Sequence, residues 1–275
     1  MNIVLTGSSS GIGRALAHRL VERGHQIWGL ARSDQSEDAR LFPSSFHATR
    51  CDLSSWEQVA SAAAEVAKVW SHIDALVACA GSQGEIGRAV TADPAAWSLT
   101  VRANLDATYF SIRAFYPLLA KAPRRAKIVC FSGGGASKSR PNFTAYASAK
   151  TAIVRLVETI ADEEKGSRLD INALAPGAIN TRLTEEVLAK GASVVGTAEF
   201  EAAAKQKATG GGSMDKALDA VEWLVSEASD GISGRLISAP WDPFTRLKDL
   251  MPQAAGKDLY MLRRTTPEDL GLKWS

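Results

Sequence analysis

A tyrosine and a lysine in the segment Tyr146-Ala-Ser-Ala-Lys150 are well suited to acid–base chemistry. Side chains four residues apart share one face of a helix. A tyrosine with its ordinary pKa of about 10 is a poor base at neutral pH, but a neighbouring ammonium group favours the phenolate. Tyr146 could then exchange a proton with an alcohol or carbonyl oxygen. The same spacing is also typical of an ordinary surface pair.

The surroundings of the pair favour the chemical interpretation. An apolar run typical of a strand, residues 127–131, is followed by Ser132 and three glycines, and the pair comes shortly after them. In an open α/β sheet, ligands bind beside the carboxyl ends of the strands. We therefore expect Ser132, Tyr146 and Lys150 to lie on the ligand side of a sheet.

The start of the chain has the pattern of a nucleotide-binding turn. A short apolar run, residues 3–5, precedes a glycine-rich turn and then an amphipathic helix pattern that extends to residue 22. Such glycines permit a tight bend, close approach of a pyrophosphate to the backbone, and close packing of helix on strand. Alone the glycines could be only a turn, but the flanking strand and helix favour a dinucleotide. The expected contacts are Gly7, Ser8, Ser9, Ser10, Gly11, Ile12 and Gly13.

The residue about 20 positions beyond this turn bears on which dinucleotide binds. NAD-binding chains carry an acid there, whereas this chain has Arg32, followed by Ser33. A guanidinium binds a 2′-phosphate through charge-assisted hydrogen bonds worth about 1.5–3 kcal/mol, and a carboxylate would repel it. We therefore expect NADP. In the alternative, Arg32 is a solvated loop charge, Asp34 takes the acid's role and the cofactor is NAD.

Other polar residues stand where later strands or helices predict a ligand edge. Asp52-Leu53 follows the run at residues 46–51, and Asp52 either contacts an adenine or bonds to its own loop. Gly81 closes the run at residues 73–80. Asn104 falls within a predicted helix over residues 95–121, where its amide must be paired or placed for function. The run at residues 169–175 ends in Pro176-Gly177-Ala178-Ile179-Asn180-Thr181.

The elements that would position these residues alternate between strand and helix. Such alternation predicts a doubly wound parallel α/β sheet, a Rossmann fold, in one domain over residues 1–275. Residues 34–45 read as a loop or short irregular helix, and Ser54 is the expected cap of the helix at residues 56–70. The remaining expected strands cover residues 26–31 and 234–238, and the remaining expected helices cover residues 146–165 and 214–227.

Two segments lie outside this alternation. Residues 182–213 are alanine-rich and polar and end near three glycines, which suits a mobile lid over a substrate or a plain surface helical hairpin. Residues 239–275 carry large apolar groups, too many for a free tail. These groups are Trp241, Phe244, Tyr260 and Trp274.

Composition and charge limit the classes of partner that we expect for this protein. The 275 residues are 45% hydrophobic and 23% charged with a net charge of +2, which gives no reason to expect nucleic acid or a membrane. No apolar run approaches a membrane span, and a buried strand at the start leaves no room for a signal peptide, so we expect a cytoplasmic protein. Cys51, Cys79 and Cys130 lie in or beside apolar runs and are expected to be buried rather than disulfide-linked. The scattered histidines imply no metal site.

Taken together, the motifs resemble those of the short-chain dehydrogenase/reductase family over roughly residues 2–238. The resemblance covers the turn from Thr6 to Gly13, then Asp52-Leu53, Asn104, the Tyr146 and Lys150 pair, and Pro176-Gly177 with Thr181. It implies an oxidoreductase that moves a hydride between NADP and a secondary alcohol or ketone. It also implies that Ala80, Gly81, Ile179 and Thr181 border the cofactor, that Lys150 bonds the nicotinamide ribose, and that Asn104 holds a water in a proton relay.

Two departures from the family pattern stand beside this resemblance. Ala78-Cys79-Ala80-Gly81 replaces the usual Asn-Asn-Ala-Gly. Gly133 stands where the catalytic serine usually does, so Ser132, one residue earlier, is expected to steady the substrate oxygen. A shift of one residue turns the side chain to the other face of a strand unless a bulge intervenes. Ser137 and Ser139 are further candidates for this role.

Alternative functions follow from the same residues. The Gly133 departure is compatible with a catalytically weak or silent NADP-binding sensor or interaction protein, which the intact Tyr146 and Lys150 disfavour. A sugar-nucleotide epimerase would need a longer substrate region. The resemblance also implies a homodimer or homotetramer through the helices at residues 95–121 and 146–165. Arg88 and Arg140 could meet an acidic substrate, although solvated surface charges are the more ordinary interpretation.

Overall fold

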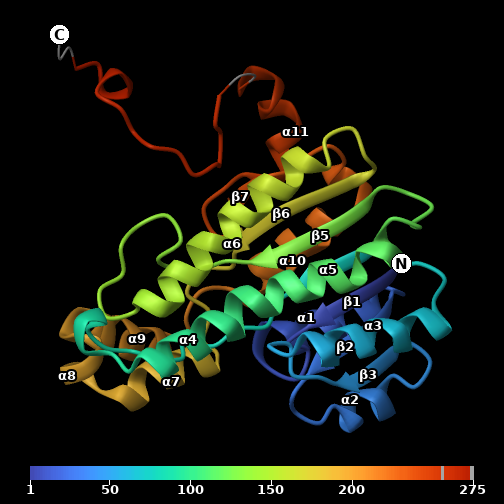
Figure 1. The fold of residues 1–275 in the computed structure, drawn as a ribbon, viewed down its shortest axis with the longest axis horizontal. Helices are drawn as coiled ribbons and strands as arrows, with labels where there is room; N and C mark the ends of the chain where they lie inside the picture. Colours follow the sequence, from blue (N-terminus) through green and yellow to red (C-terminus); the bar gives the residue numbers. More distant parts are fainter. Residues whose placement is uncertain (255–256, 273–275) are drawn as a thin grey trace.

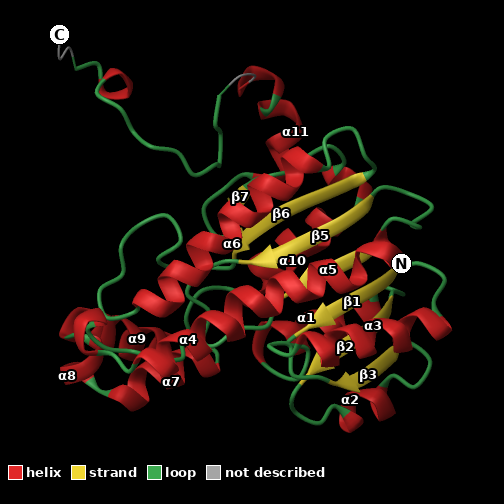
Figure 2. Cartoon of the chain, viewed as in Figure 1, coloured by secondary structure: helices red, strands yellow, loops and turns green. Residues whose placement is uncertain are grey.

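A seven-stranded parallel sheet forms the centre of the molecule, in the computed structural model that describes residues 1–254 and 257–272. The strand order is β3-β2-β1-β4-β5-β6-β7, so the winding reverses between β1 and β4. Figure 2 shows the sheet with helices on both of its faces. The strands are β1 (Asn2–Thr6), β2 (Gln26–Ala31), β3 (Phe46–Arg50), β4 (Ala75–Ala78), β5 (Ala126–Phe131), β6 (Leu169–Ala175) and β7 (Leu236–Ser238).

Two hydrophobic clusters, one on each face of the sheet, hold the helices in place. Successive strand residues alternate between them: Val4 belongs to the cluster that contains α3, α5 and α6, whereas Ile3 and Leu5 belong to the one that contains α1 and α10. The doubly wound fold is therefore confirmed. The helices flanking the sheet are α1 (Gly11–Glu22), α2 (Ser36–Leu41), α3 (Trp56–Val69), α5 (Ala107–Leu119), α6 (Thr144–Glu163) and α10 (Met214–Val225), while α4 (Pro94–Val101) packs against α6.

The long helix predicted over residues 95–121 is interrupted. It consists of α4 and α5 joined by a π-helical turn, Arg102–Asp106, with Asn104 at its centre. Such turns widen the helix by one residue and are frequent at functional sites. Apolar spacing alone does not distinguish a π turn from an α turn.

The structure corrects the predicted cap of α3 and shows which of the two predicted forms residues 34–45 adopt. The cap of α3 is Ser55, whose hydroxyl accepts a hydrogen bond from the Gln58 amide, and not Ser54. Ser54 instead donates its hydroxyl and its amide to the Asp52 carboxylate, which draws it away from the helix. In the segment predicted as loop or irregular helix, a short regular helix, α2, forms.

Residues 182–213 fold as three helices, α7 (Arg182–Lys190), α8 (Ala192–Val195) and α9 (Thr197–Thr209). They surround a third, smaller cluster that includes Phe143, Val187 and Val195. Figure 1 shows them grouped beside α4, beyond the ends of the strands. The segment is thus a packed cover rather than a two-helix hairpin, and its mobility as a lid stays a prediction.

The C-terminal segment packs partly against the domain. The Leu236 amide donates to the Tyr260 carbonyl at 2.8 Å, which places this part of the tail along β7. Phe244 and Tyr260 pack against the cluster beneath α10, and a short helix, α11 (Leu247–Leu250), lies between them in the chain. Trp241, by contrast, is 85% exposed. Trp274 lies outside the described residues.

Within the described ranges, every helix is too short or too polar to cross a membrane. Over the same ranges, no group of three or more histidine, cysteine, aspartate or glutamate side chains could hold a metal ion.

Candidate active site

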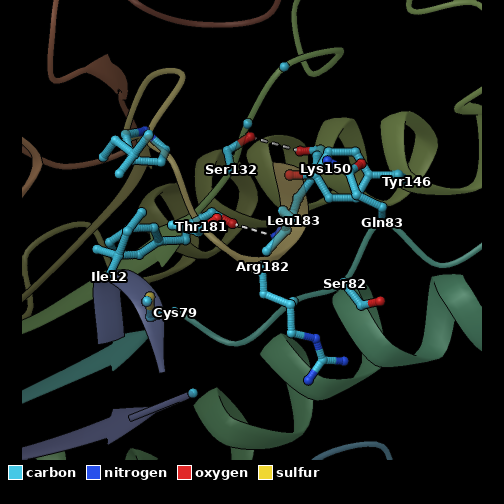
Figure 3. Close-up of a pocket in the computed structure, with 18 of the residues that line it drawn as sticks. Ile12, Cys79, Ser82, Gln83, Ser132, Tyr146, Lys150, Thr181, Arg182 and Leu183 are labelled. Carbon is cyan, nitrogen blue, oxygen red and sulfur yellow. Dashed lines mark hydrogen bonds between the residues drawn. The ribbon is translucent and has the colours of Figure 1, made fainter. Parts of the chain in front are cut away.

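A cavity of about 1060 Å³ lies at the carboxyl ends of the strands, where the winding reverses. It extends from the glycine-rich turn after β1 to the cover helices α7 and α9. Figure 3 shows part of its lining, including Ile12 of the turn and Arg182 and Leu183 of α7. Most residues expected to bind cofactor or substrate line it. They are Gly7, Ser9, Ser10, Gly11, Ile12, Gly13, Arg32, Ser33, Asp52, Leu53, Ala80, Gly81, Ser132, Tyr146, Lys150, Pro176, Gly177, Ile179 and Thr181.

The glycine-rich turn has room only for glycine at two positions. A Cβ at Gly13 would lie 2.2 Å from the Gly7 carbonyl oxygen. Gly7 has a φ of +73°, and a Cβ there would lie 2.8 Å from the Ala80 Cα. At the start of α1, the Ser10 side chain forms no capping hydrogen bond, so the first amides of the helix are left for another acceptor. This arrangement fits a pyrophosphate.

Ser8 is the member of the turn that does not line the cavity. Its side chain is fully buried, and its hydroxyl donates to the Gln35 amide oxygen. The missing side chain of Gly29 makes room for this contact, because a Cβ there would lie 2.6 Å from the Ser8 Oγ. The Ser8 hydroxyl therefore anchors the turn to β2 and α2, and the hydroxyls on the cavity side belong to Ser9 and Ser10.

Arg32 lies exposed at the cavity wall beside Asp52. Hydrogen bonds from Ser54 lower the pKa of Asp52 and outweigh the opposing effect of burial, and the charge of Arg32 adds a smaller lowering. Asp34 accepts hydrogen bonds from the amide and hydroxyl of Ser36. The carboxylate that could have replaced Arg32 in binding a ribose is therefore engaged at the start of α2.

Lys150 is buried on α6 and donates its Nζ to the Phe131 carbonyl oxygen at 2.9 Å. Burial lowers its pKa to about 8, and the thiols of Cys79 and Cys130 oppose this shift. The Lys150 Nζ lies 5.6 Å from the centroid of the Tyr146 ring. The pair thus shares one wall of the cavity, as the spacing predicts.

Asn104 is fully buried behind this wall and is not itself part of the cavity lining. Its amide nitrogen donates to the carbonyls of Ser82 and Thr100. A Cβ at Gly81 would lie 2.8 Å from its amide oxygen and 3.3 Å from the Lys150 Nζ. Glycine at position 81 therefore lets Asn104 and Lys150 approach the same point from two helices.

The phenol of Tyr146 is almost completely buried and faces Gly133. A Cβ at Gly133 would lie 2.6 Å from the Tyr146 hydroxyl oxygen, closer than side chains tolerate. Burial raises the pKa of Tyr146 to about 12; the charge of Arg140 opposes this shift and that of Glu186 adds to it. Burial therefore favours the neutral, protonated phenol in this arrangement.

Ser132 does not occupy the position opposite the phenol. Its hydroxyl donates to the Lys150 carbonyl oxygen at 3.2 Å, the contact drawn in Figure 3, and so ties the end of β5 to α6. β5 continues in register with β6 up to this point, with the Ser132 amide bonded to Leu174, so no bulge rotates the side chain. Ser137, further along the loop, is exposed at the cavity, whereas Ser139 is not part of its lining.

Two charged side chains that line the cavity, Glu186 and Glu199, were not predicted from the sequence, whereas Arg140 and Arg88 were named only as possible contacts for an acidic substrate. Arg140 is largely buried and forms an ion pair with Glu199 of α9, while Arg88 is exposed as an ordinary surface charge. Glu186 of α7 accepts a hydrogen bond from the Gln83 amide. Nothing in the local sequence around Arg140 points to Glu199, which is 59 residues away. Only the tertiary structure brings the Arg140 and Glu199 side chains together.

The cysteines behave mainly as core residues. All three are free, and burial raises the thiol pKa of Cys51 to about 11 and those of Cys79 and Cys130 to about 12. Cys79 also borders the cavity. Thiols with raised pKa values are poor nucleophiles, so chemistry at this site falls to the other residues.

Comparison with known proteins gives a consistent result. The family model described as short chain dehydrogenase matches residues 1–192. A short-chain dehydrogenase of Monascus purpureus is 30% identical over 251 residues, which cover 87% of this chain and 80% of that protein. Among solved structures, the ligand-free aldohexose dehydrogenase of Thermoplasma acidophilum is similar, with 25% sequence identity and a TM-score of 0.74. The match covers 86% of this chain and 91% of that protein's chain.

The structure of a short-chain dehydrogenase/reductase of Saccharomyces cerevisiae supports the same fold, with a TM-score of 0.81 at 22% sequence identity. The match covers 89% of this chain and 97% of that protein's chain. The matched region includes β1 to α7 and therefore both the glycine-rich turn and the Tyr146 and Lys150 pair. The chain belongs to the short-chain dehydrogenase/reductase family of oxidoreductases.

Proposed function

We propose that this protein is an NADP-dependent oxidoreductase acting on a secondary alcohol or its ketone. The observation that carries the proposal is that one cavity contains both the glycine-rich turn and the Tyr146 and Lys150 pair. NADP, when bound, supplies or accepts the hydride. The chain's own task is then to hold the substrate oxygen and to exchange a proton with it.

The residues divide this task by position. Gly7, Gly13 and the first amides of α1 would hold the pyrophosphate. Lys150, which lines the same cavity as Tyr146 and whose pKa is lowered by burial, would bond the nicotinamide ribose. Tyr146 would donate its proton to a ketone oxygen during reduction, or accept one during oxidation. Ser132 would act by fixing α6 through its bond to Lys150.

Arg32 supports NADP over NAD. It is exposed at the cavity wall, and the nearby Asp34 carboxylate is engaged with Ser36. A fluorescence titration with NADPH and with NADH tests this. We expect Arg32→Glu to weaken NADPH binding by about 1.5–3 kcal/mol, on the order of tenfold to a hundredfold, because a carboxylate repels the 2′-phosphate.

The matched control is Lys121→Glu, which makes the same change of charge at an exposed position after α5. It should leave both affinities unchanged. Equal weakening of NADPH binding by the two variants would remove the argument for Arg32, and failure of both nucleotides to bind the unaltered protein would remove the proposed function itself.

A second candidate is a catalytically silent NADP-binding protein of the same fold. Two observations favour it: no hydroxyl stands opposite Tyr146 at Gly133, and burial raises the pKa of that phenol to about 12. A panel of ketones with NADPH separates the two candidates. Turnover that Tyr146→Phe abolishes supports the enzyme, whereas tight NADPH binding without turnover supports the silent protein.

We also propose that the chain assembles as a homodimer or homotetramer through α5 and α6. Tyr109 and Tyr116 of α5 are large and exposed, as expected of a helix face that another subunit covers. Sedimentation at micromolar concentration should show a species larger than one chain. A single monomeric species would exclude this assembly.

A further inference from the structure

Arg140 lines the cavity, and its guanidinium is held there by several contacts. Its Nε and Nη2 donate to the two carboxylate oxygens of Glu199 at 3.2 and 2.9 Å, and its Nη1 donates to the Gln83 amide oxygen at 3.2 Å. Its side chain is only 16% exposed. A bidentate pair of this kind fixes the orientation of the guanidinium as well as its position.

Two aromatic rings complete the contact. The Arg140 Cζ lies 3.7 Å from the centroid of the Phe143 ring and 5.8 Å from that of Tyr146. Both distances lie within the range of a cation–π contact. Phe143 is fully buried, so the guanidinium has a fixed surface beneath it and stands next to the phenol of Tyr146.

The charged groups around Tyr146 come from four elements. Lys150 lies on the same helix but directs its Nζ to the Phe131 carbonyl. Arg140 comes from the loop before α6, Glu186 from α7, and Glu199 from α9 through its pair with Arg140. Burial has the largest effect and raises the pKa of Tyr146; of these charges, Arg140 opposes that shift and Glu186 adds to it.

The hydroxyl that would ordinarily hydrogen-bond a reactive phenol is missing here. Gly133 has no side chain, and the Ser132 hydroxyl is bonded to the helix backbone. A cation at a fixed distance is a second physical means of favouring the charged form of a phenol. Arg140 provides such a cation from the side of the cavity that the cover helices enclose.

We propose that Arg140 is a positioning residue for Tyr146, and that Glu199 sets its effect by holding the guanidinium in place and partly neutralising it. The inference deepens the proposed function, since it concerns the proton exchange at the same site. It predicts opposite effects for the two partners of one ion pair. Loss of the cation disfavours the phenolate, whereas loss of the Glu199 charge leaves the cation uncompensated and favours it.

The opposite signs separate an electrostatic role from a structural one. If Arg140 and Glu199 served only to hold the cover helices against the loop, removing either partner would disturb Tyr146 in the same direction. Arg140→Lys adds a further distinction, because it keeps the charge and loses the bidentate geometry.

Direct titration of Tyr146 tests the proposal without any substrate. The chain has four tyrosines, so ¹³C labelling of the tyrosine ζ-carbon gives a simple NMR spectrum, in which Tyr146→Phe identifies the signal. Between about pH 8 and about pH 11, we expect Arg140→Gln to move the onset of ionisation to higher pH and Glu199→Gln to move it to lower pH, each by about half a unit or more. Arg140→Lys should stay near the unaltered protein.

The control is Arg88→Gln, which removes the same charge from an exposed position and should not move the signal. Shifts in one direction for both partners, or no shift in either, would overturn the proposal. Should Arg140→Gln fail to fold by circular dichroism, Glu199→Gln and Arg140→Lys still decide: a Glu199→Gln signal that does not move to lower pH contradicts the inference. NADPH binding and turnover are measured separately, so their failure is distinguishable from this one.

Discussion

Gly133 affects the site because it has no side chain to displace the Tyr146 phenol. The Tyr146 phenol occupies the space in which a Cβ at position 133 would stand. The position of the phenol therefore depends on the absence of a side chain at position 133 as well as on the contacts of α6. Arg140 and Lys150 then provide the charges around it.

This placement predicts the effect of a single methyl group. Gly133→Ala brings a Cβ to 2.6 Å from the Tyr146 hydroxyl oxygen, so the ring must move. We expect turnover to fall by about tenfold or more, because small displacements of an acid–base group cost large factors in rate. NADPH affinity, measured by fluorescence titration, should be nearly unchanged.

Gly134→Ala is the matched control. A Cβ at position 134 would meet no atom within 4 Å, so this variant should keep the rate of the unaltered protein. Equal loss of turnover in both variants would mean that the loop's flexibility, and not the contact with the phenol, is what matters.

The π turn between α4 and α5 acts at the scale of an element. It places Asn104 so that one amide joins the turn to the loop after β4, through the Ser82 carbonyl and amide, and to Thr100 within the helix. Since Asn104 is fully buried, water cannot replace these bonds. The side chain therefore fixes the relation between two elements that border the cavity.

Removal of the Asn104 amide should lower the stability of the fold. We expect Asn104→Ala to lower the free energy of unfolding by about 1–3 kcal/mol, because it removes the hydrogen bonds that the buried amide donates to the Ser82 and Thr100 carbonyls. Urea denaturation measures the change. Thr159→Ala removes an exposed side-chain bond to a helix carbonyl on α6 and should change stability by less than about 0.5 kcal/mol. A cost at Asn104 no larger than at Thr159 would contradict this role.

Elements of this fold are predictable from sequence to the extent that they depend on neighbouring residues. Strands buried on both faces, such as β1 and β5, appear as short apolar runs, and the glycine-rich turn follows directly from its spacing. The π turn is not predictable in this way, because its apolar spacing matches an α-helix. The division of residues 182–213 into three helices depends on a cluster completed by Phe143, which lies far away in the sequence.

The same distinction holds within the site. The pairing of Tyr146 with Lys150 is a matter of helical spacing, so it was predictable. The orientation of Ser132, the burial of Ser8 against Gln35, and the pairing of Arg140 with Glu199 each depend on where another element passes. Such contacts are decided by packing, and no local pattern in the sequence encodes them.

The C-terminal segment matters at the scale of the whole molecule. Its apolar residues include the fully buried Leu247 and the partly buried Phe244, which pack beneath α10. Leu262 adds contacts to α6, since its carbonyl accepts from Arg155 and its amide donates to Glu158. The segment thus completes the core rather than extending from a finished domain.

A truncation after Ser238 tests this description. We expect its thermal midpoint to fall by about 4 °C or more, because even 1–2 kcal/mol of lost burial shifts the midpoint of a domain of this size by several degrees. A truncation after Leu262 keeps the packed residues and should leave the midpoint unchanged, as measured by differential scanning calorimetry. Equal midpoints for both shortened chains would show that residues 239–262 contribute nothing to stability.

The hydrogen bond between Leu236 and Tyr260 has a consequence for the behaviour of the protein in concentrated solution. β7 is the last strand of the sheet, and unpaired backbone groups on such a strand form a template on which a second chain can add. In the intact chain, Tyr260 occupies part of that edge. Proteolytic loss of the tail would therefore be expected to promote aggregation through strand addition, as well as to lower stability.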